Sequence, residues 1–176
     1  QNERIGCFVL QKNSKLNEPA PADLYTIGTL SKIERMIRSD GEINAQVKGI
    51  SRVKILSYES HEQFLLAKVK ELSDEIDDSP EIKALCNHIT NQFRKAINLG
   101  KSVDFLAFMN IMSENSPSEL ADLISSVLDV KPVERQDLLE TINVKERLEK
   151  VSQYLTKEIK VLELERRLAS KTQERF

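Results

Sequence analysis

The sequence contains few residues whose type and spacing could support catalysis. Its two histidines are His61 and His88, and its two cysteines are Cys7 and Cys86. None of them has the ligand spacing of a zinc site or belongs to a redox-active CxxC motif. We therefore interpret the histidines as surface or satisfied core residues. The cysteines are interpreted as buried free thiols, which fit a reducing compartment.

Motifs that bind phosphate, nucleotides or calcium are also missing from the sequence. The five glycines are too dispersed to form a GxxxxGK[ST], GxGxxG or GxSxG motif. An acidic cluster at Asp74, Glu75, Asp77 and Asp78 lacks the alternating oxygen ligands and central glycine of an EF-hand loop. We interpret it as a solvated interdomain linker, with calcium binding as the alternative. The sequence thus predicts no catalytic, cofactor-binding or metal-binding residue in this chain.

Composition argues against two classes of partner. The chain has 176 residues and a net charge of −2, with 26 Lys and Arg against 28 Asp and Glu. Nucleic-acid binding relies on a basic surface, so we expect no nucleic-acid partner. No apolar run approaches the roughly 20 residues that cross a bilayer, so we expect no membrane partner. Because the chain starts without Met and ends within a helical pattern, we expect it to be an internal fragment.

Residues 1–73 are predicted to form a β-rich domain. An apolar run at residues 5–10 is typical of a strand buried on both faces. Asp40-Gly41 predicts a tight hairpin, because glycine tolerates the positive φ that such a turn needs. The return strand alternates, with apolar side chains at Ile43, Ala45 and Val47. The other elements expected in this half are strands at residues 27–37, 53–56 and 64–72, a loop at residues 12–22 and a turn from Glu59 to Glu62.

The remaining sequence is predicted to be helical, which gives fold class α+β. We expect a helical bundle over residues 79–142 and one long helix over residues 143–176. Ser79, Ser116 and Asn143 are expected to cap helices, and Ser116 with Glu119 forms a capping box. Apolar residues on the long helix predict that its first part packs on the bundle and that its end emerges as an exposed arm.

Four stretches in the chain resemble the amino-terminal region of Lon proteases, which are ATP-dependent. In chain order they are DLYTIGTL at residues 23–30, DGEINAQVKGISRV at residues 40–53, LADLI at residues 120–124, and QDLLE with VKERL at residues 136–140 and 144–148. One departure is Glu42, where the family usually has Thr. Another departure is that this sequence lacks the strand and helix that open the family's first domain.

The resemblance implies a non-catalytic region that recruits unfolded, damaged or degron-bearing proteins. It implies a PUA-like β-barrel, a helical bundle and a helix leading to an ATPase module. ATP, Mg²⁺ and a Ser–Lys dyad would belong to parts of the protease outside this chain, which would assemble as a homohexamer with other Lon subunits. The bacterial cytoplasm is the expected compartment, with the mitochondrial matrix as the alternative.

Two groups of residues are candidates for substrate contact. One is the apolar stripe of Phe105, Phe108, Met109 and Met112, because methionine and aromatic side chains suit promiscuous contacts. The same spacing is that of a core-facing helix, which is the interpretation we favour. The other group is the hairpin at residues 39–42 with the loop at residues 19–25, where the candidates are Leu24 and Tyr25.

Two alternatives to recruitment stay open. The chain could be mainly a scaffold for assembly, for which the candidates on the long helix are Leu162, Leu164 and Leu168. It could also be a stand-alone binding module that borrows the same β-domain.

Overall fold

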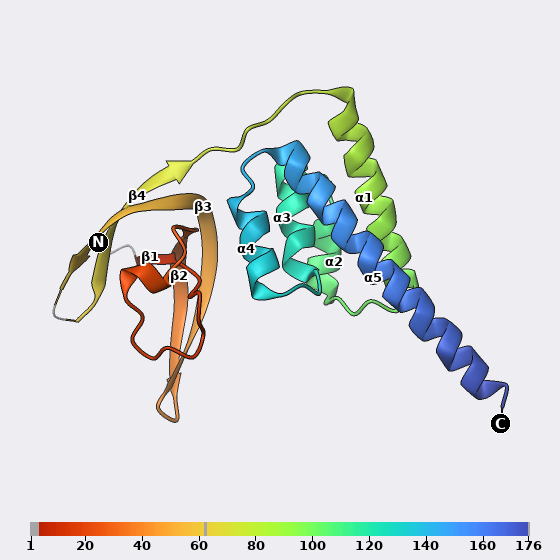
Figure 1. The fold of residues 1–176 in the computed structure, drawn as a ribbon, viewed down its shortest axis with the longest axis horizontal. Helices are drawn as coiled ribbons and strands as arrows, with labels where there is room; N and C mark the ends of the chain where they lie inside the picture. Colours follow the sequence, from red (N-terminus) through yellow and green to blue (C-terminus); the bar gives the residue numbers. More distant parts are fainter. Residues whose placement is uncertain (1–3, 62, 176) are drawn as a thin grey trace. The chain divides into compact units, whose positions relative to one another are not determined.

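The computed structural model describes residues 4–61 and 63–175 and divides into two compact units, residues 1–73 and 74–176. The first unit carries the strands and the second carries the α-helices (Figure 1). This order confirms the predicted α+β class.

The β unit is an antiparallel sheet whose strands follow one another in sequence order. Its elements are β1 (Ile5–Phe8), the short 3-10 helix η1 (Pro21–Asp23), β2 (Ile27–Ser39), β3 (Glu42–Ser60) and β4 (Leu65–Leu72). The predicted hairpin joins β2 to β3, and Asp40 and Gly41 have φ values of 52° and 80°. Positive φ at both central positions is what a tight turn between twisted strands requires, so this prediction is confirmed.

The strand β3 is longer than the sequence predicts. It runs without interruption from Glu42 to Ser60, and its pairing with both neighbours shifts register near Ile50 and Leu56. A bulge absorbs an extra residue and bends the strand without ending it, which is why two predicted strands are one. Of the turn predicted from Glu59 to Glu62, Glu62 lies outside the described residues.

The prediction that the first strand is buried on both faces is wrong. Ile5 and Phe8 of β1 are 48% and 49% exposed, because β1 is an edge strand paired with β2 alone among the described strands. Residues 40–50 are exposed on both faces, although their apolar residues alternate as expected. In this part of the hairpin β2 and β3 pair only with each other, so neither face has a covering layer.

The core of the β unit is small and depends on a close approach of backbone segments. Leu24, Val53 and Ile55 are its buried apolar side chains among the described residues. Gly28 is buried beside the β1 segment, where an added Cβ would lie 2.5 Å from the Phe8 carbonyl oxygen. A side chain at this position would push β1 away from β2.

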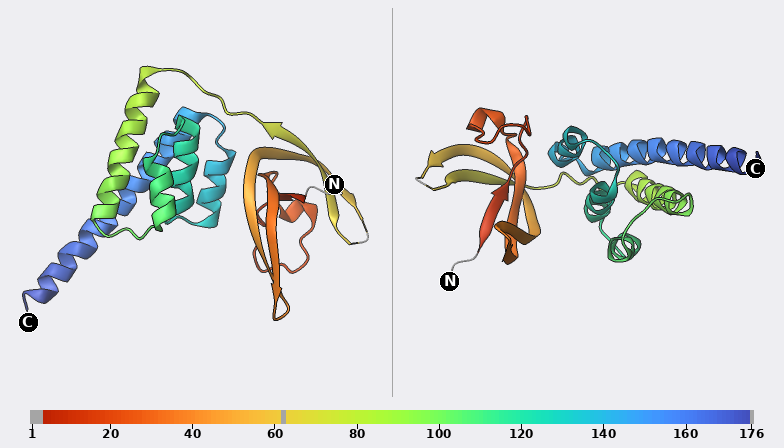
Figure 2. Two further views of the ribbon diagram at one scale, coloured as in Figure 1. Left: turned by 180° about the vertical axis from the view of Figure 1, so that it is seen from behind. Right: turned by 90° about the horizontal axis from the view of Figure 1, so that it is seen from below.

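Up to Arg175, the helical unit contains five helices around one apolar core. They are α1 (Pro80–Asn98), α2 (Phe105–Met112), α3 (Pro117–Val127), α4 (Pro132–Glu140) and α5 (Val144–Gln173). Buried residues include Phe93 of α1, Ile124 of α3 and Leu148 of α5, and α5 packs against both α1 and α3. Figure 2 shows α5 continuing beyond the other helices, which confirms the predicted exposed arm.

Side-chain caps begin three of the helices. Ser116 and Glu119 form the predicted reciprocal capping box at α3, and the Asn143 side chain accepts a hydrogen bond from the Glu146 amide at α5. The predicted side-chain cap at Ser79 is wrong. Its hydroxyl is buried and has no hydrogen-bond partner among the described residues, although Ser79 does occupy the N-cap position of α1.

Candidate interaction surfaces

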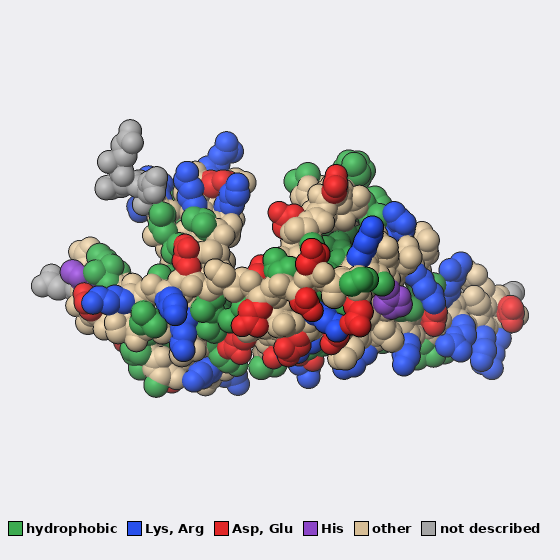
Figure 3. All heavy atoms as spheres, turned by 90° about the horizontal axis from the view of Figure 1, so that it is seen from above, with side chains coloured by type: hydrophobic (Ala, Val, Ile, Leu, Met, Phe, Trp, Pro, Cys, Tyr) green, Lys and Arg blue, Asp and Glu red, His purple; other side chains and the backbone are tan. Residues whose placement is uncertain are grey.

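The helix α2 presents an apolar edge that the core does not cover. Phe105, Leu106 and Met109 are 77%, 69% and 49% exposed. The favoured core-facing interpretation is therefore wrong for Phe105 and Met109, while Phe108 and Met112 pack against the core. In the space-filling view, hydrophobic side chains gather at the upper edge of the helical unit (Figure 3).

An N-terminal cap and one buried side chain of α2 hold its apolar edge in place. The Asp104 side chain accepts a hydrogen bond of 2.9 Å from the Ala107 amide and so caps the first turn. Ile111 lies on the opposite side and is 2% exposed in the core. Because Ile111 occupies the core-facing position, Phe105 and Met109 turn toward solvent. The cap at Asp104 was not predicted, although Asp before an apolar run is the usual signal.

The second group of predicted contact residues divides in the same way. Leu24 is 8% exposed, so its side chain lies inside the β unit, whereas Tyr25 is half-buried with Lys12 near its ring. The hairpin carries exposed apolar residues that were not predicted to contact a substrate. They are Met36, Ile37, Ile43, Val47 and Ile50.

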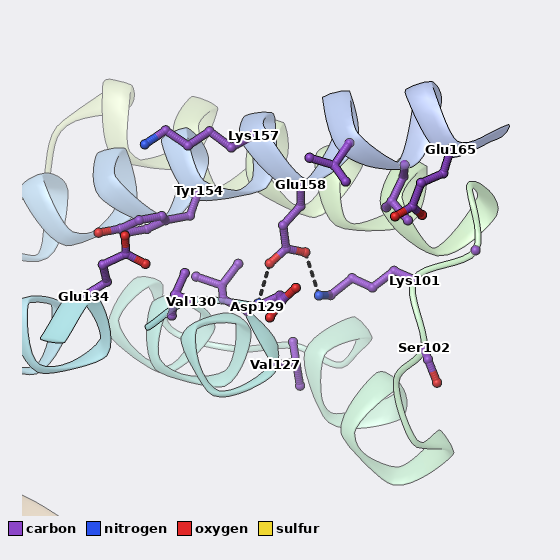
Figure 4. A pocket seen from close by; sticks show the side chains of 14 residues that line it. Lys101, Ser102, Val127, Asp129, Val130, Glu134, Tyr154, Lys157, Glu158 and Glu165 are labelled. Carbon is purple, nitrogen blue, oxygen red and sulfur yellow. Dashed lines mark hydrogen bonds and ion pairs between the residues drawn. The ribbon is translucent and has the colours of Figure 1, made fainter. Parts of the chain in front are cut away.

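A groove of about 660 Å³ runs along α5, beside the loop after α1 and the loop after α3. Its apolar lining is Val127, Leu128, Val130, Val161 and Leu162. At its centre the Glu158 carboxylate accepts hydrogen bonds from the Lys101 ammonium (2.6 Å) and the Asp129 amide (2.5 Å), as Figure 4 shows. The Lys101 and Glu158 side chains are only 8% and 12% exposed, so the pair fixes both loops to α5.

The groove has an excess of negative charge. Its lining has four carboxylates and two ammonium groups, those of Asp129, Glu134, Glu158, Glu165, Lys101 and Lys157. Burial raises the pKa of the Tyr154 hydroxyl, and the Glu134 and Asp137 carboxylates raise that pKa further. Figure 4 shows Glu134 beside Tyr154 at one end of the groove and Glu165 at the other. Groove residues come from four segments of the chain, so sequence spacing could not reveal them.

At the start of α5, outside the groove lining, Arg147 forms a buried ion-pair cluster. Its guanidinium is 0% exposed and donates to Asp74 (2.7 Å), Asp122 (3.4 Å), Ser118 (3.2 Å) and the Thr141 carbonyl oxygen (2.8 Å). The cluster joins α3, the start of α5 and the segment before α1. The cluster was not predicted from the sequence, although one signal for it is present there. Arg147 stands among core positions of a helix whose other buried residues are apolar.

The acidic segment before α1 is attached to the helical unit at one end. Besides the Asp74–Arg147 ion pair, the Glu75 backbone pairs with Asn143 in a short parallel bridge. The predicted solvated linker is therefore wrong for Asp74, whose carboxylate meets a buried cation. Asp77 and Asp78 are exposed as predicted.

The other polar candidates form no site in the part of the chain that the structure describes. No group of three His, Cys, Asp or Glu residues there could hold a metal ion. His61 and His88 are exposed, and the His61 ring stacks on Phe64. Cys7 and Cys86 are unpaired and half-buried, and burial raises the pKa of each thiol. None of the described helices is both long and apolar enough to span a membrane.

The four family-like stretches are divided between the two units. The first ends in the start of β2 and the second covers the hairpin and the first part of β3, while the third lies in α3 and the fourth in α4 and α5. The Arg147–Asp122 ion pair directly connects the third stretch to the fourth.

Comparisons with known proteins agree with this arrangement. The chain is 37% identical over 170 residues to the Lon protease of Clostridium acetobutylicum and 30% identical over 167 residues to that of Desulforamulus reducens. Each match covers 94% of this chain, but only 22% and 21% of those proteases. The chain therefore spans about a fifth of the length of these curated relatives.

A solved structure has the same fold. It is the N-terminal domain of the Mycobacterium avium complex Lon protease, which superposes with a TM-score of 0.62 at 21% identity over 88% of this chain and 90% of that one. The sequence profile of the ATP-dependent protease La (LON) substrate-binding domain matches residues 1–157. This chain belongs to the LON substrate-binding domain family.

Proposed function

We propose that this chain is a non-catalytic region of a Lon-type protease that captures unfolded or damaged proteins through their exposed apolar side chains. The observation that carries the proposal is the apolar edge of α2, with Phe105, Leu106 and Met109 exposed. Folded proteins bury most of their large apolar side chains, and unfolded proteins do not. An accessible apolar surface therefore distinguishes the two without reading a sequence.

The chemistry of this edge suits many different partners. Met109 has a flexible, polarizable side chain that adapts to partners of different shape, and Phe105 offers a large contact area. Both are held on a capped helix, so little backbone conformational freedom is lost on binding. The edge is small, so each single contact is expected to be weak.

A binding titration tests this proposal. Fluorescently labelled lysozyme, made permanently unfolded by reduction and carbamidomethylation, which blocks the thiols without adding charge, is titrated with the 176-residue chain while anisotropy is recorded. We expect saturable binding of the unfolded lysozyme and none of native lysozyme that carries the same label. A chain that binds neither protein at high micromolar concentration contradicts the proposal.

The whole protein would extend this role. We propose that it is a cytoplasmic bacterial Lon hexamer, in which a separate ATPase module binds ATP and Mg²⁺ and a peptidase domain cleaves what this chain captures. Support comes from the family match and from the bacterial relatives.

A second candidate function is a scaffold for assembly through the α5 arm. Val161, Leu164 and Leu168 are 54%, 52% and 56% exposed, and their spacing of three and four residues is that of a coiled-coil seam. Leu162 instead lines the groove. If the arm associates, the chain sediments as an oligomer and Leu164→Ser with Leu168→Ser returns it to a monomer. A chain that is monomeric throughout the micromolar range contradicts this candidate.

A further inference from the structure

We propose that the groove along α5 binds short polypeptide segments in which a Lys or Arg side chain lies next to apolar residues. The proposal rests on the proposed function, because unfolded proteins are the source of such segments. It adds a second site with a different preference from that of α2.

The groove has the size and lining of a binding site for a few side chains. Its volume of about 660 Å³ lies within the usual range for ligand pockets, roughly 300–1,000 Å³. Val130 and Leu162 are half-buried, and Val161 is 54% exposed at the edge. An apolar side chain placed against them would leave water without disturbing the core.

The carboxylates of the groove differ in whether they already have a hydrogen-bond or ion-pair partner. Glu158 is neutralised by Lys101, and Glu134 accepts a hydrogen bond from the Lys131 amide at the start of α4. Within residues 4–61 and 63–175, neither the Asp129 nor the Glu165 carboxylate takes part in a hydrogen bond or ion pair. These two groups are therefore available to a cation from outside.

Charge complementarity decides the class of ligand. With an excess of carboxylates around an apolar wall, a segment carrying Lys or Arg gains attraction, and a segment carrying Asp or Glu meets like charge. Burial is the main cause of the raised pKa of Tyr154, and the Glu134 and Asp137 carboxylates add to it because they disfavour a further negative charge there. Of the two lysines that line the groove, Lys101 binds Glu158. The Lys157 ammonium instead lies 5.7 Å from the centre of the Tyr154 ring.

The groove is also held in shape before any ligand arrives. The largely buried Lys101–Glu158 pair and the Glu158–Asp129 hydrogen bond anchor both loops to α5. A site that is already ordered spends less free energy on ordering itself, so even a short segment can bind measurably.

Three labelled peptides test the proposal by anisotropy with the full 176-residue chain. They share the same apolar residues and differ at one central position, which is Arg, Gln or Glu. We expect the Arg peptide to bind most tightly and the Glu peptide most weakly. The double variant Asp129→Asn, Glu165→Gln should weaken Arg-peptide binding by about three- to tenfold, since exposed ion pairs contribute ~0.2–1 kcal/mol each. The salt dependence of binding should fall with it.

A matched control separates the groove from general electrostatics. Glu149→Gln removes an exposed carboxylate from the same helix but outside the groove, and it should leave Arg-peptide binding unchanged. Equal binding of the three peptides, no binding of any peptide at millimolar concentration, or an unchanged affinity in the double variant overturns the proposal.

These variants distinguish a failure of the groove proposal from a failure of the proposed function. Substitutions on the α2 edge should weaken binding of unfolded lysozyme while leaving the preference for the Arg peptide intact. If the unfolded protein binds through α2 but the peptides show no charge preference, the groove proposal alone fails. If the Arg peptide binds through the groove but unfolded lysozyme does not bind, the proposed function fails instead.

Discussion

Replacing Arg147 with methionine is expected to lower the free energy of unfolding of the helical unit by about 2–4 kcal/mol. Removing one partner of a buried ion pair typically costs about 3–5 kcal/mol. The expected loss is smaller here because the Asp74 and Asp122 side chains are 26% and 43% exposed, so water compensates part of the lost interaction. Since domains are stable by only about 5–15 kcal/mol, such a change is large. Urea unfolding followed by far-ultraviolet circular dichroism measures it.

Two further variants establish the origin of this loss. Arg94→Met removes an exposed arginine from α1 and should change stability by no more than about 0.5 kcal/mol. Asp74→Asn should cost stability in the parent chain but less in the Arg147→Met background, where its ion pair with the guanidinium is already lost. Additive effects of the two substitutions, or a loss below about 1 kcal/mol for Arg147→Met, would show that the ion-pair cluster does not hold the helical unit together.

The double variant Phe105→Ser, Met109→Ser is expected to weaken binding of unfolded lysozyme at least tenfold. Burying one such side chain at a contact is worth about 1.5–3 kcal/mol when burial is complete, and tenfold corresponds to about 1.4 kcal/mol. The anisotropy titration of unfolded lysozyme measures this change. Stability should change little, because both side chains are already about half exposed or more.

Val133→Ser is the control for the α2 variant. Val133 lies on α4 and is 56% exposed, so the substitution removes exposed apolar surface, smaller in area, from another helix. It should leave the affinity for unfolded lysozyme unchanged. Equal losses in both variants would mean that binding follows total apolar surface rather than the α2 edge.

Local signals in the sequence predicted the secondary structure well where the chemistry is local. The Asp40-Gly41 hairpin and the Ser116–Glu119 capping box each depend on residues within four positions of one another. The exposed end of α5 was also predictable, because the apolar residues there lie on a different side of the helix from those that pack on the bundle. Ser79 shows the limit of such signals, since the cap position is right but the hydroxyl makes no hydrogen bond among the described residues.

The candidate sites depend on contacts that periodicity does not encode. An apolar stripe on a short helix predicts that one side is buried but not which residues remain outside it. On α2, the buried position belongs to Ile111, which leaves Phe105 and Met109 exposed. Asp74 and Arg147 are 73 residues apart in the chain, so their pairing follows from how the helices pack.

The titration of unfolded and native lysozyme with the intact chain tests most directly whether this domain captures non-native protein. Both forms have the same residue sequence, so they differ mainly in how much apolar surface they expose. Saturable binding of the unfolded form, no binding of the native form and loss of binding in the α2 variant are the expected results. Binding of both forms with equal affinity, or undiminished binding by the α2 variant, would contradict recruitment through this surface.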